Sequence, residues 1–100
     1  MKSAVDPAVI ATIWSVIQER AKTPSLESYT SRLLNDDKGI DKILEKVGEE
    51  SIEFIIAAKN GINERTVQEA SDLIFHLLVA LRAADIDLSD VMQELKRRRK

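Results

Sequence analysis

Two adjacent segments of this chain carry apolar side chains around much of their circumference when their residues are placed at 100° intervals, as in an α-helix. The first spans residues 40–59, and its second half is apolar nearly all round, so we expect it to be central; the other spans residues 63–84. A chain of 100 residues buries only a modest core, and two such helices present more apolar surface than one small bundle covers. We therefore expect an all-α fold whose bundle is completed by homodimerisation.

Start signals place two more helices before residue 40. Asp6 followed by Pro7 predicts a helix that runs to about Arg20, because aspartate caps free amides and proline fits the first helical position. Thr23-Pro24-Ser25 interrupts it, and residues 28–34 are expected to form a short extra helix.

Similar signals define the remaining boundaries. Segment 40–59 should stop at Asn60-Gly61, since glycine accepts a left-handed conformation at little cost. Asn63 is expected to cap the next helix and Asp87 the last one. No segment alternates apolar and polar residues as a half-buried strand does. The sequence thus predicts one all-α domain over residues 1–100, with four main helices and the short one.

The composition narrows the classes of function. Lys plus Arg number 15 and Asp plus Glu 17, a formal net charge of −2, which argues against nucleic-acid binding as the main role. The longest apolar run, residues 73–81, is far shorter than the roughly 20 residues of a membrane-spanning helix, and the amino terminus has no signal-peptide pattern. The chain has no cysteine, which excludes a disulfide framework and a cysteine nucleophile. We expect a cytoplasmic protein that binds neither nucleic acid nor membrane.

Two acidic motifs, Glu49-Glu50-x-x-Glu53 and Glu69-x-x-Asp72, offer the main candidate metal ligands. Carboxylates three or four residues apart share a helix face, so two facing helices can direct them at one hard cation such as Mg²⁺. Glu50 and Asp72 both fall within apolar stripes, where an ionised carboxylate is costly unless it is paired or bound to metal. Metal binding is therefore assigned most firmly to Glu50 and Asp72, while Glu49 and Glu53 lie on a charged edge.

Three other features have simpler interpretations. His76, one turn after Asp72, could join the site, but a lone histidine in an apolar run is more often a hydrogen-bonded core group. Trp14 lies on the apolar stripe of the first helix and is assigned to the core. The basic tail Lys96–Lys100 is interpreted as a solvated helix end whose charges complement the helix dipole.

Beyond the acidic motifs, longer stretches carry a family resemblance. Residues 38–61, KGIDKILEKVGEESIEFIIAAKNG, and 69–81, EASDLIFHLLVAL, closely resemble the phosphoribosyl-ATP pyrophosphohydrolases of histidine biosynthesis. Ser28-Tyr29-Thr30 and Leu33-Leu34 fit the same family. The resemblance implies an all-α dimer that uses Mg²⁺ to hydrolyse 1-(5-phosphoribosyl)-ATP to 1-(5-phosphoribosyl)-AMP and pyrophosphate, the second step of that pathway.

The resemblance also implies roles for individual residues. By position, Glu50, Glu53, Glu69 and Asp72 match metal-binding carboxylates. Glu49 matches a residue that completes the site or orients water, and either Glu49 or Glu53 is the candidate general base. Candidate substrate contacts are Lys42, Lys46, Lys59, Asn60, Tyr29 and Thr30, with Arg32 and Arg65 as weaker candidates. For Lys42 and Lys46, pairing with glutamates of the same helix is the alternative.

Two alternative functions stay open on the sequence. The acidic core fits a pool-cleaning nucleoside triphosphate pyrophosphohydrolase of the same fold equally well. A non-catalytic helical dimer with solvated acidic faces is the other alternative, and the carboxylates within apolar stripes argue against it.

Overall fold

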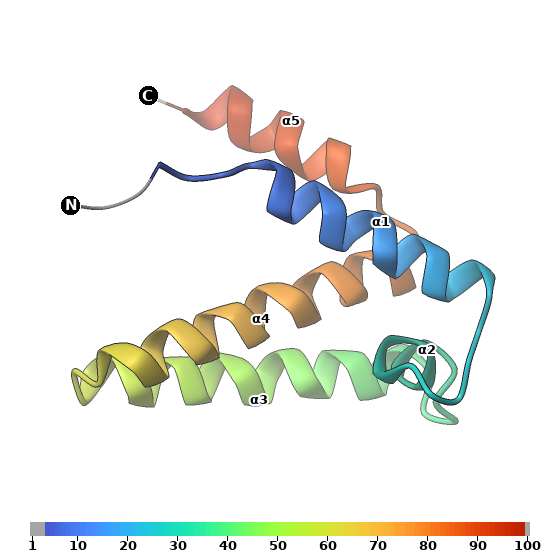
Figure 1. The fold of residues 1–100 in the computed structure, drawn as a ribbon, viewed down its shortest axis with the longest axis horizontal. Helices are drawn as coiled ribbons and strands as arrows, with labels where there is room; N and C mark the ends of the chain where they lie inside the picture. Colours follow the sequence, from blue (N-terminus) through green and yellow to red (C-terminus); the bar gives the residue numbers. More distant parts are fainter. Residues whose placement is uncertain (1–3, 100) are drawn as a thin grey trace.

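The computed structural model describes residues 4–99, which form five helices (Figure 1). They are α1 (Ala8–Lys22), α2 (Tyr29–Leu34), α3 (Ile40–Lys59), α4 (Asn63–Ala83) and α5 (Leu88–Arg98). No strand occurs within this described range. The prediction of an all-α fold with four longer helices and one short helix is confirmed.

Side chains bond free backbone amides near three of the helix starts. Ser28 caps α2 by accepting from the Ser31 amide, and Asp87 caps α5 by accepting from the Ser89 amide. At α1, Asp6 Oδ1 accepts from the Ala8 amide at 3.0 Å, but Pro7 occupies the cap position and Ala8 is the first helical residue, so the prediction that Pro7 is the first helical residue is wrong by one position. These interactions satisfy backbone amides that have no partner inside a helix.

The turn between α3 and α4 differs from the sequence expectation at one residue. Gly61 has φ +69° directly after α3, as predicted for a glycine at a helix end. Asn63, however, is the first residue of α4, and Ile62 occupies the cap position without a side-chain hydrogen bond. The prediction that Asn63 caps α4 is wrong. The Ile62 amide bonds back to the Ala57 carbonyl at 3.4 Å, so the tight turn leaves no room for a separate capping residue.

The core gathers around the carboxyl-terminal half of α4. Leu78 and Val79 are buried there against Ile17 of α1, Leu33 of α2 and Ile43 of α3. In Figure 1, α4 lies between α3 and α1. The expectation that segment 40–59 would be central is therefore wrong within one chain, where α4 is the central helix.

The second half of α3 instead reaches past this core. Its Ile52, Ile55 and Ile56 are 60%, 61% and 54% exposed. Only α4 packs extensively against α3, so one flank of the α3–α4 hairpin stays open in the single chain.

Two further expectations can be compared with the fold. Trp14 is partly buried and packs against the core cluster, which confirms its assignment. Among the described helices, none combines the length and apolarity that crossing a membrane requires.

Candidate metal centre

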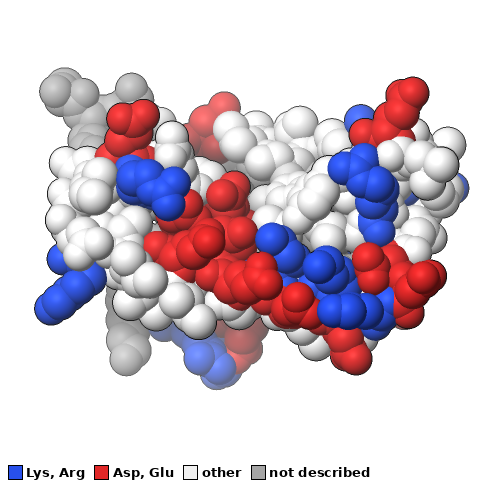
Figure 2. All heavy atoms as spheres, turned by 90° about the horizontal axis from the view of Figure 1, so that it is seen from below, with Lys and Arg blue, Asp and Glu red and all other residues white. Residues whose placement is uncertain are grey.

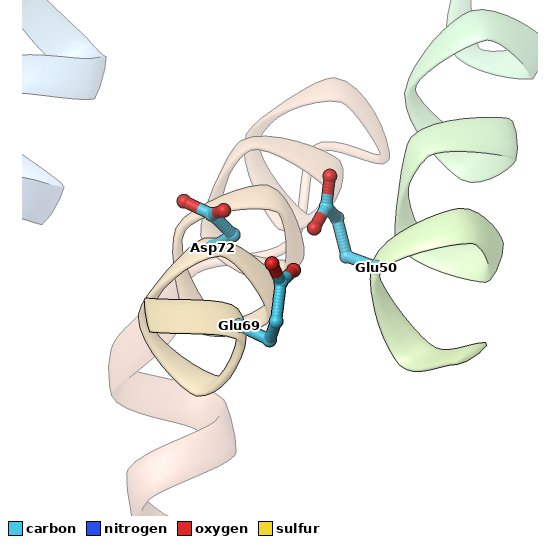
Figure 3. A group of neighbouring side chains, drawn as sticks. All are labelled: Glu50, Glu69 and Asp72. Atoms are coloured by element: carbon cyan, nitrogen blue, oxygen red, sulfur yellow. The ribbon is translucent and has the colours of Figure 1, made fainter. Parts of the chain in front are cut away.

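Three carboxylates from the two acidic motifs meet between α3 and α4. Glu50 projects from α3 toward Glu69 on α4, and Asp72 lies one turn further along α4 (Figure 3). One oxygen of each lies within 4.8 Å of the others. Antiparallel pairing of the helices brings the two motifs to the same level, while the spacing of three residues stacks Glu69 and Asp72 on one face.

Burial within this cluster differs from the sequence expectation. Glu50 is only 7% exposed, as its place in an apolar stripe predicted, and Glu69 is only 4% exposed. Asp72 is exposed, so the expectation that it lies among buried apolar neighbours is wrong. Its stripe on α4 is covered near Val79, where α1 packs, but is open at Asp72. A projection down the helix axis shows only the direction of each side chain, so it cannot distinguish the covered end of α4 at Val79 from the open turn at Asp72.

The two buried carboxylates are incompletely paired. Within the described chain, Glu50 Oε2 and Glu69 Oε2 have no hydrogen-bond partner. Their other oxygens face cations: Lys46 Nζ lies 3.9 Å from Glu50 Oε1, and Arg65 Nη2 lies 3.1 Å from Glu69 Oε1. Buried polar atoms without partners are costly, and a hard cation with oxygen ligands would remove that cost. The donor set and its unpartnered oxygens therefore fit a hard metal cation.

The pKa of Glu50 reflects this environment. Burial, as the largest cause, and the neighbouring Glu69, Glu53 and Asp72 together raise this pKa from 4.5 to about 7, because each disfavours a negative charge on Glu50. Without a bound cation, the cluster therefore resists carrying its full negative charge at neutral pH.

The other two predicted acidic residues lie beside the cluster. Glu53 is exposed and lies outside the group of three, but it is near enough to affect the Glu50 pKa. Glu49 is exposed and pairs with Lys46 at 3.3 Å. The predicted charged edge on α3 is confirmed. Figure 2 shows acidic side chains gathered on the α3 side of the molecule, with basic side chains next to them.

The predicted substrate-binding cations separate into two groups. Lys46 lies at the cluster, between Glu49 and Glu50. Lys42 pairs with Glu45 at 3.9 Å, which was the alternative interpretation. Lys59 and Asn60 lie at the opposite end of α3, about 14 Å along its axis from Glu50 at 1.5 Å per residue. Within one chain, the structure brings Lys46 to the cluster but not Lys59 or Asn60.

The α2 candidates also differ from each other. Tyr29 is 42% exposed and its hydroxyl lies 2.9 Å from His76 Nε2. Thr30 is buried, so in this structure only Tyr29 is accessible to a nucleotide. His76 is buried with both ring nitrogens in hydrogen-bond distance of a partner, which confirms its interpretation as a hydrogen-bonded core group.

Two interactions were not anticipated from the sequence. The Arg65–Glu69 ion pair has the i, i+4 spacing typical of helical pairs, so a signal for it was present. The Tyr29–His76 hydrogen bond joins residues far apart in the chain, and no spacing pattern indicates it. Arg32, a weaker substrate candidate, instead donates to the Leu26 carbonyl at 2.8 Å.

Comparison with known proteins places these residues in a family. The family model described as phosphoribosyl-ATP pyrophosphohydrolase matches residues 11–99. A relative from Methanoregula boonei, named phosphoribosyl-ATP pyrophosphatase, is 68% identical over 99 residues, which cover 99% of this chain and 95% of that protein. A relative of the same name from Methanoculleus marisnigri is 61% identical over 92% of this chain and 95% of that protein. A third relative of this name, from Methanocorpusculum labreanum, is 60% identical over 94% of this chain and 91% of that protein.

Both the family match and these alignments extend over nearly the whole chain, including both acidic motifs. The chain therefore belongs to the phosphoribosyl-ATP pyrophosphohydrolase family.

Proposed function

We propose that this chain hydrolyses 1-(5-phosphoribosyl)-ATP to 1-(5-phosphoribosyl)-AMP and pyrophosphate, the second step of histidine biosynthesis, as a Mg²⁺-dependent homodimer. Family membership and the name shared by its relatives support the reaction. The observation that carries the proposal is the Glu50–Glu69–Asp72 cluster, in which two buried oxygens lack a partner.

The acidic cluster is the proposed magnesium site. Glu50, Glu69 and Asp72 would hold the ion, and Glu53 would complete the ligand set from the neighbouring turn of α3. A bound magnesium ion would neutralise phosphate charge and stabilise the pyrophosphate leaving group. Carboxylates alone would repel a polyphosphate.

The remaining polar residues would bind phosphate and move a proton. Lys46 lies beside Glu49 and Glu50, where its ammonium group can attract the phosphates. Water attacks phosphorus, the bond to the pyrophosphate oxygen breaks, and the proton of the water passes to a carboxylate that holds no metal. Glu49 is the first candidate for this base, and Glu53 is the alternative if it does not bind the metal, because both are exposed at the edge of the cluster. Lys59, Asn60 and Thr30 remain weaker proposals for substrate contact.

The open flank of the α3–α4 hairpin supports the homodimer. Several large apolar side chains of α3, α4 and the turn between them are exposed, namely Ile52, Ile55, Ile56, Ile62, Val67, Ile74 and Leu77. Scattered exposed apolar residues are ordinary, but so many on two adjacent helices are typical of a protein interface. A second copy would cover this flank and place the acidic clusters in one assembly.

The experiment that tests the reaction is incubation of the purified chain with phosphoribosyl-ATP and Mg²⁺. We expect release of pyrophosphate and phosphoribosyl-AMP, identified by mass. Glu50→Gln should abolish turnover, while Glu45→Gln, an exposed substitution on the same helix, should retain it. A folded dimer that releases no pyrophosphate would contradict the proposal, and much faster turnover of ordinary nucleoside triphosphates would favour a pool-cleaning function.

A further inference from the structure

Tyr29 and His76 form a hydrogen-bonded pair that the proposed reaction does not yet use. The Tyr29 hydroxyl lies 2.9 Å from His76 Nε2, and His76 Nδ1 lies 2.7 Å from the backbone carbonyl oxygen of Asp72. His76 is only 5% exposed. Its ring is therefore held at both nitrogens, by the backbone of α4 on one side and by α2 on the other.

The contact with the Asp72 carbonyl determines which ring nitrogen carries a proton. A carbonyl oxygen only accepts hydrogen bonds, so Nδ1 must donate. In the neutral imidazole, Nε2 then keeps its lone pair and accepts, which requires the Tyr29 hydroxyl to donate. The single hydroxyl proton is committed to His76, and Tyr29 Oη can offer only lone pairs to a ligand.

Aromatic packing holds the Tyr29 ring in place. The Phe75 ring stacks against it with centroids 6.2 Å apart, and the His76 ring meets it edge-on at 5.9 Å. The Arg32 guanidinium lies 6.0 Å from the Tyr29 centroid. Tyr29 is nevertheless 42% exposed, so a ligand can reach it.

Tyr29 is connected to the acidic cluster through His76, because His76 Nδ1 lies 2.7 Å from the backbone carbonyl oxygen of Asp72, a member of the cluster. α2 therefore places Tyr29 next to the turn of α4 that carries Asp72. Burial raises the pKa of Tyr29, the charge of Lys46 lowers it, and the carboxylates of Glu50, Asp72 and Glu49 raise it again.

We propose that His76 is a positioning residue that holds Tyr29 as a hydrogen-bond acceptor for a sugar hydroxyl of the nucleotide substrate. This inference rests on the proposed function. Phosphate oxygens are acceptors and gain nothing from a hydroxyl without a free proton, whereas a sugar hydroxyl donates. A sugar is bonded directly to the phosphate chain that the acidic cluster would bind, so its hydroxyls are the donor groups next to those phosphates.

A spectroscopic test uses the fact that the chain has one histidine and one tyrosine. Long-range proton–nitrogen spectra of the metal-free protein at pH 8 should show His76 protonated at Nδ1 and unprotonated at Nε2. In Tyr29→Phe, Nδ1 should stay protonated, and the Nε2 resonance should shift because its donor is lost. A dominant Nε2-protonated or doubly protonated ring would overturn the inference.

A kinetic test measures how much the Tyr29 hydroxyl oxygen, as a hydrogen-bond acceptor, contributes to substrate binding. Tyr29→Phe keeps the ring and should raise KM about tenfold, the loss expected from one hydrogen bond, with kcat reduced less than threefold. Deoxy analogues, each lacking one hydroxyl of either sugar, should include one whose KM is the same for wild type and Tyr29→Phe. If every analogue retains the effect of the substitution, the contact with a sugar hydroxyl is refuted.

Variants of His76 separate positioning from packing. His76→Gln places an amide carbonyl near the Tyr29 hydroxyl and should keep KM within about threefold of wild type, whereas His76→Asn is too short to hold the hydroxyl and should raise KM more than His76→Gln does, though less than Tyr29→Phe, which removes the accepting oxygen. Ser31→Ala is the control, because it removes a buried α2 hydrogen bond to the Arg20 carbonyl without touching Tyr29. Equal effects of Gln and Asn, or a rise in KM with Ser31→Ala, would overturn the inference.

The two proposals fail in different ways. A wild-type chain that releases no pyrophosphate from phosphoribosyl-ATP refutes the proposed function, while the spectra still report the His76 proton. An active wild type whose KM is unchanged by Tyr29→Phe refutes only the role of the pair. Should the His76 variants not fold, Tyr29→Phe alone still decides the kinetic test.

Discussion

Replacing Glu50 with glutamine should stabilise the metal-free protein at pH 8 while removing its response to Mg²⁺. Glu50 is buried, and burial together with neighbouring carboxylates raises its pKa from 4.5 to about 7. A group whose pKa is raised on folding stabilises the fold below its unfolded pKa, and this contribution is lost as the pH rises through the folded value. Above pH 7, the ionised Glu50 therefore lowers the free energy of unfolding of the metal-free protein.

The size of this cost follows from the pKa shift. At about 1.4 kcal/mol per pKa unit, a rise from 4.5 to about 7 corresponds to at most about 3 to 4 kcal/mol. Solvent near the exposed Asp72 screens these charges, so we expect about 1 to 2 kcal/mol. The glutamine amide can also donate to the unpartnered Glu69 Oε2. For a domain of this size, each kcal/mol shifts the melting temperature by about 4 to 8 °C, so the predicted increase is roughly 4 to 16 °C.

The assay is thermal unfolding of wild type and Glu50→Gln at one protein concentration, with chelator or with Mg²⁺, at pH 5.5 and pH 8. Fixed concentration matters because a dimer's melting temperature depends on it. In chelator, the gain from Glu50→Gln should be largest at pH 8 and less than half as large at pH 5.5, because pH 5.5 lies between the unfolded pKa of 4.5 and the folded pKa of about 7. With Mg²⁺ at pH 8, wild type should gain stability and the variant should not.

Glu45→Gln serves as the matched control, because Glu45 is an exposed residue of α3 that pairs with Lys38 and Lys42. This control should lose little stability and keep the full Mg²⁺ response. If Glu50→Gln instead melts below wild type in chelator at pH 8, or responds to Mg²⁺ as wild type does, the account of Glu50 as a strained metal ligand is refuted.

Three further predictions concern the surroundings of the cluster. Arg65→Met removes the cation next to Glu69; metal-free stability should fall by up to about 1 kcal/mol, and the Mg²⁺-induced rise in melting temperature should grow, as thermal unfolding would show. An unchanged Mg²⁺ response would contradict competition between Arg65 and the metal. Ile55→Glu places a charge on the open flank of α3 and should convert a dimer to monomers in light scattering, whereas a monomeric wild type would refute the proposed interface. Ser28→Ala removes the α2 cap and should cost about 1 kcal/mol in chemical denaturation, and a loss below about 0.3 kcal/mol would show that the cap contributes little.

Local chemistry explains why the helix boundaries were predictable. The aspartate and serine caps and Gly61 act through neighbouring backbone groups, so their effects are visible in short stretches of sequence. Asn63 failed as a predicted cap because the geometry of the turn from Gly61 assigned that position to Ile62. Whether Ile62 or Asn63 occupies the cap position depends on how α3 and α4 pack against each other. Local sequence propensity carries no information about that packing.

The candidate site was predictable in composition but not in arrangement. Helical periodicity identified Glu50 as an inward carboxylate, and the structure confirms its burial. The same reasoning placed Asp72 among apolar neighbours and made no statement on the burial of Glu69, yet Asp72 is exposed and Glu69 is buried, because a helical projection ignores where along α4 a neighbouring helix provides cover.

By itself, the sequence determined the helical class, the helix limits to within a few residues, the residue types of the acidic cluster and the family. These properties depend on interactions between residues near each other in the chain, or on motifs read directly. Only the tertiary structure decided that Glu69 is buried, that Lys46 rather than Lys59 lies at the cluster, and that Tyr29 bonds to His76. Each of these depends on which helices meet and at what level, and that is set by packing between segments far apart in the chain.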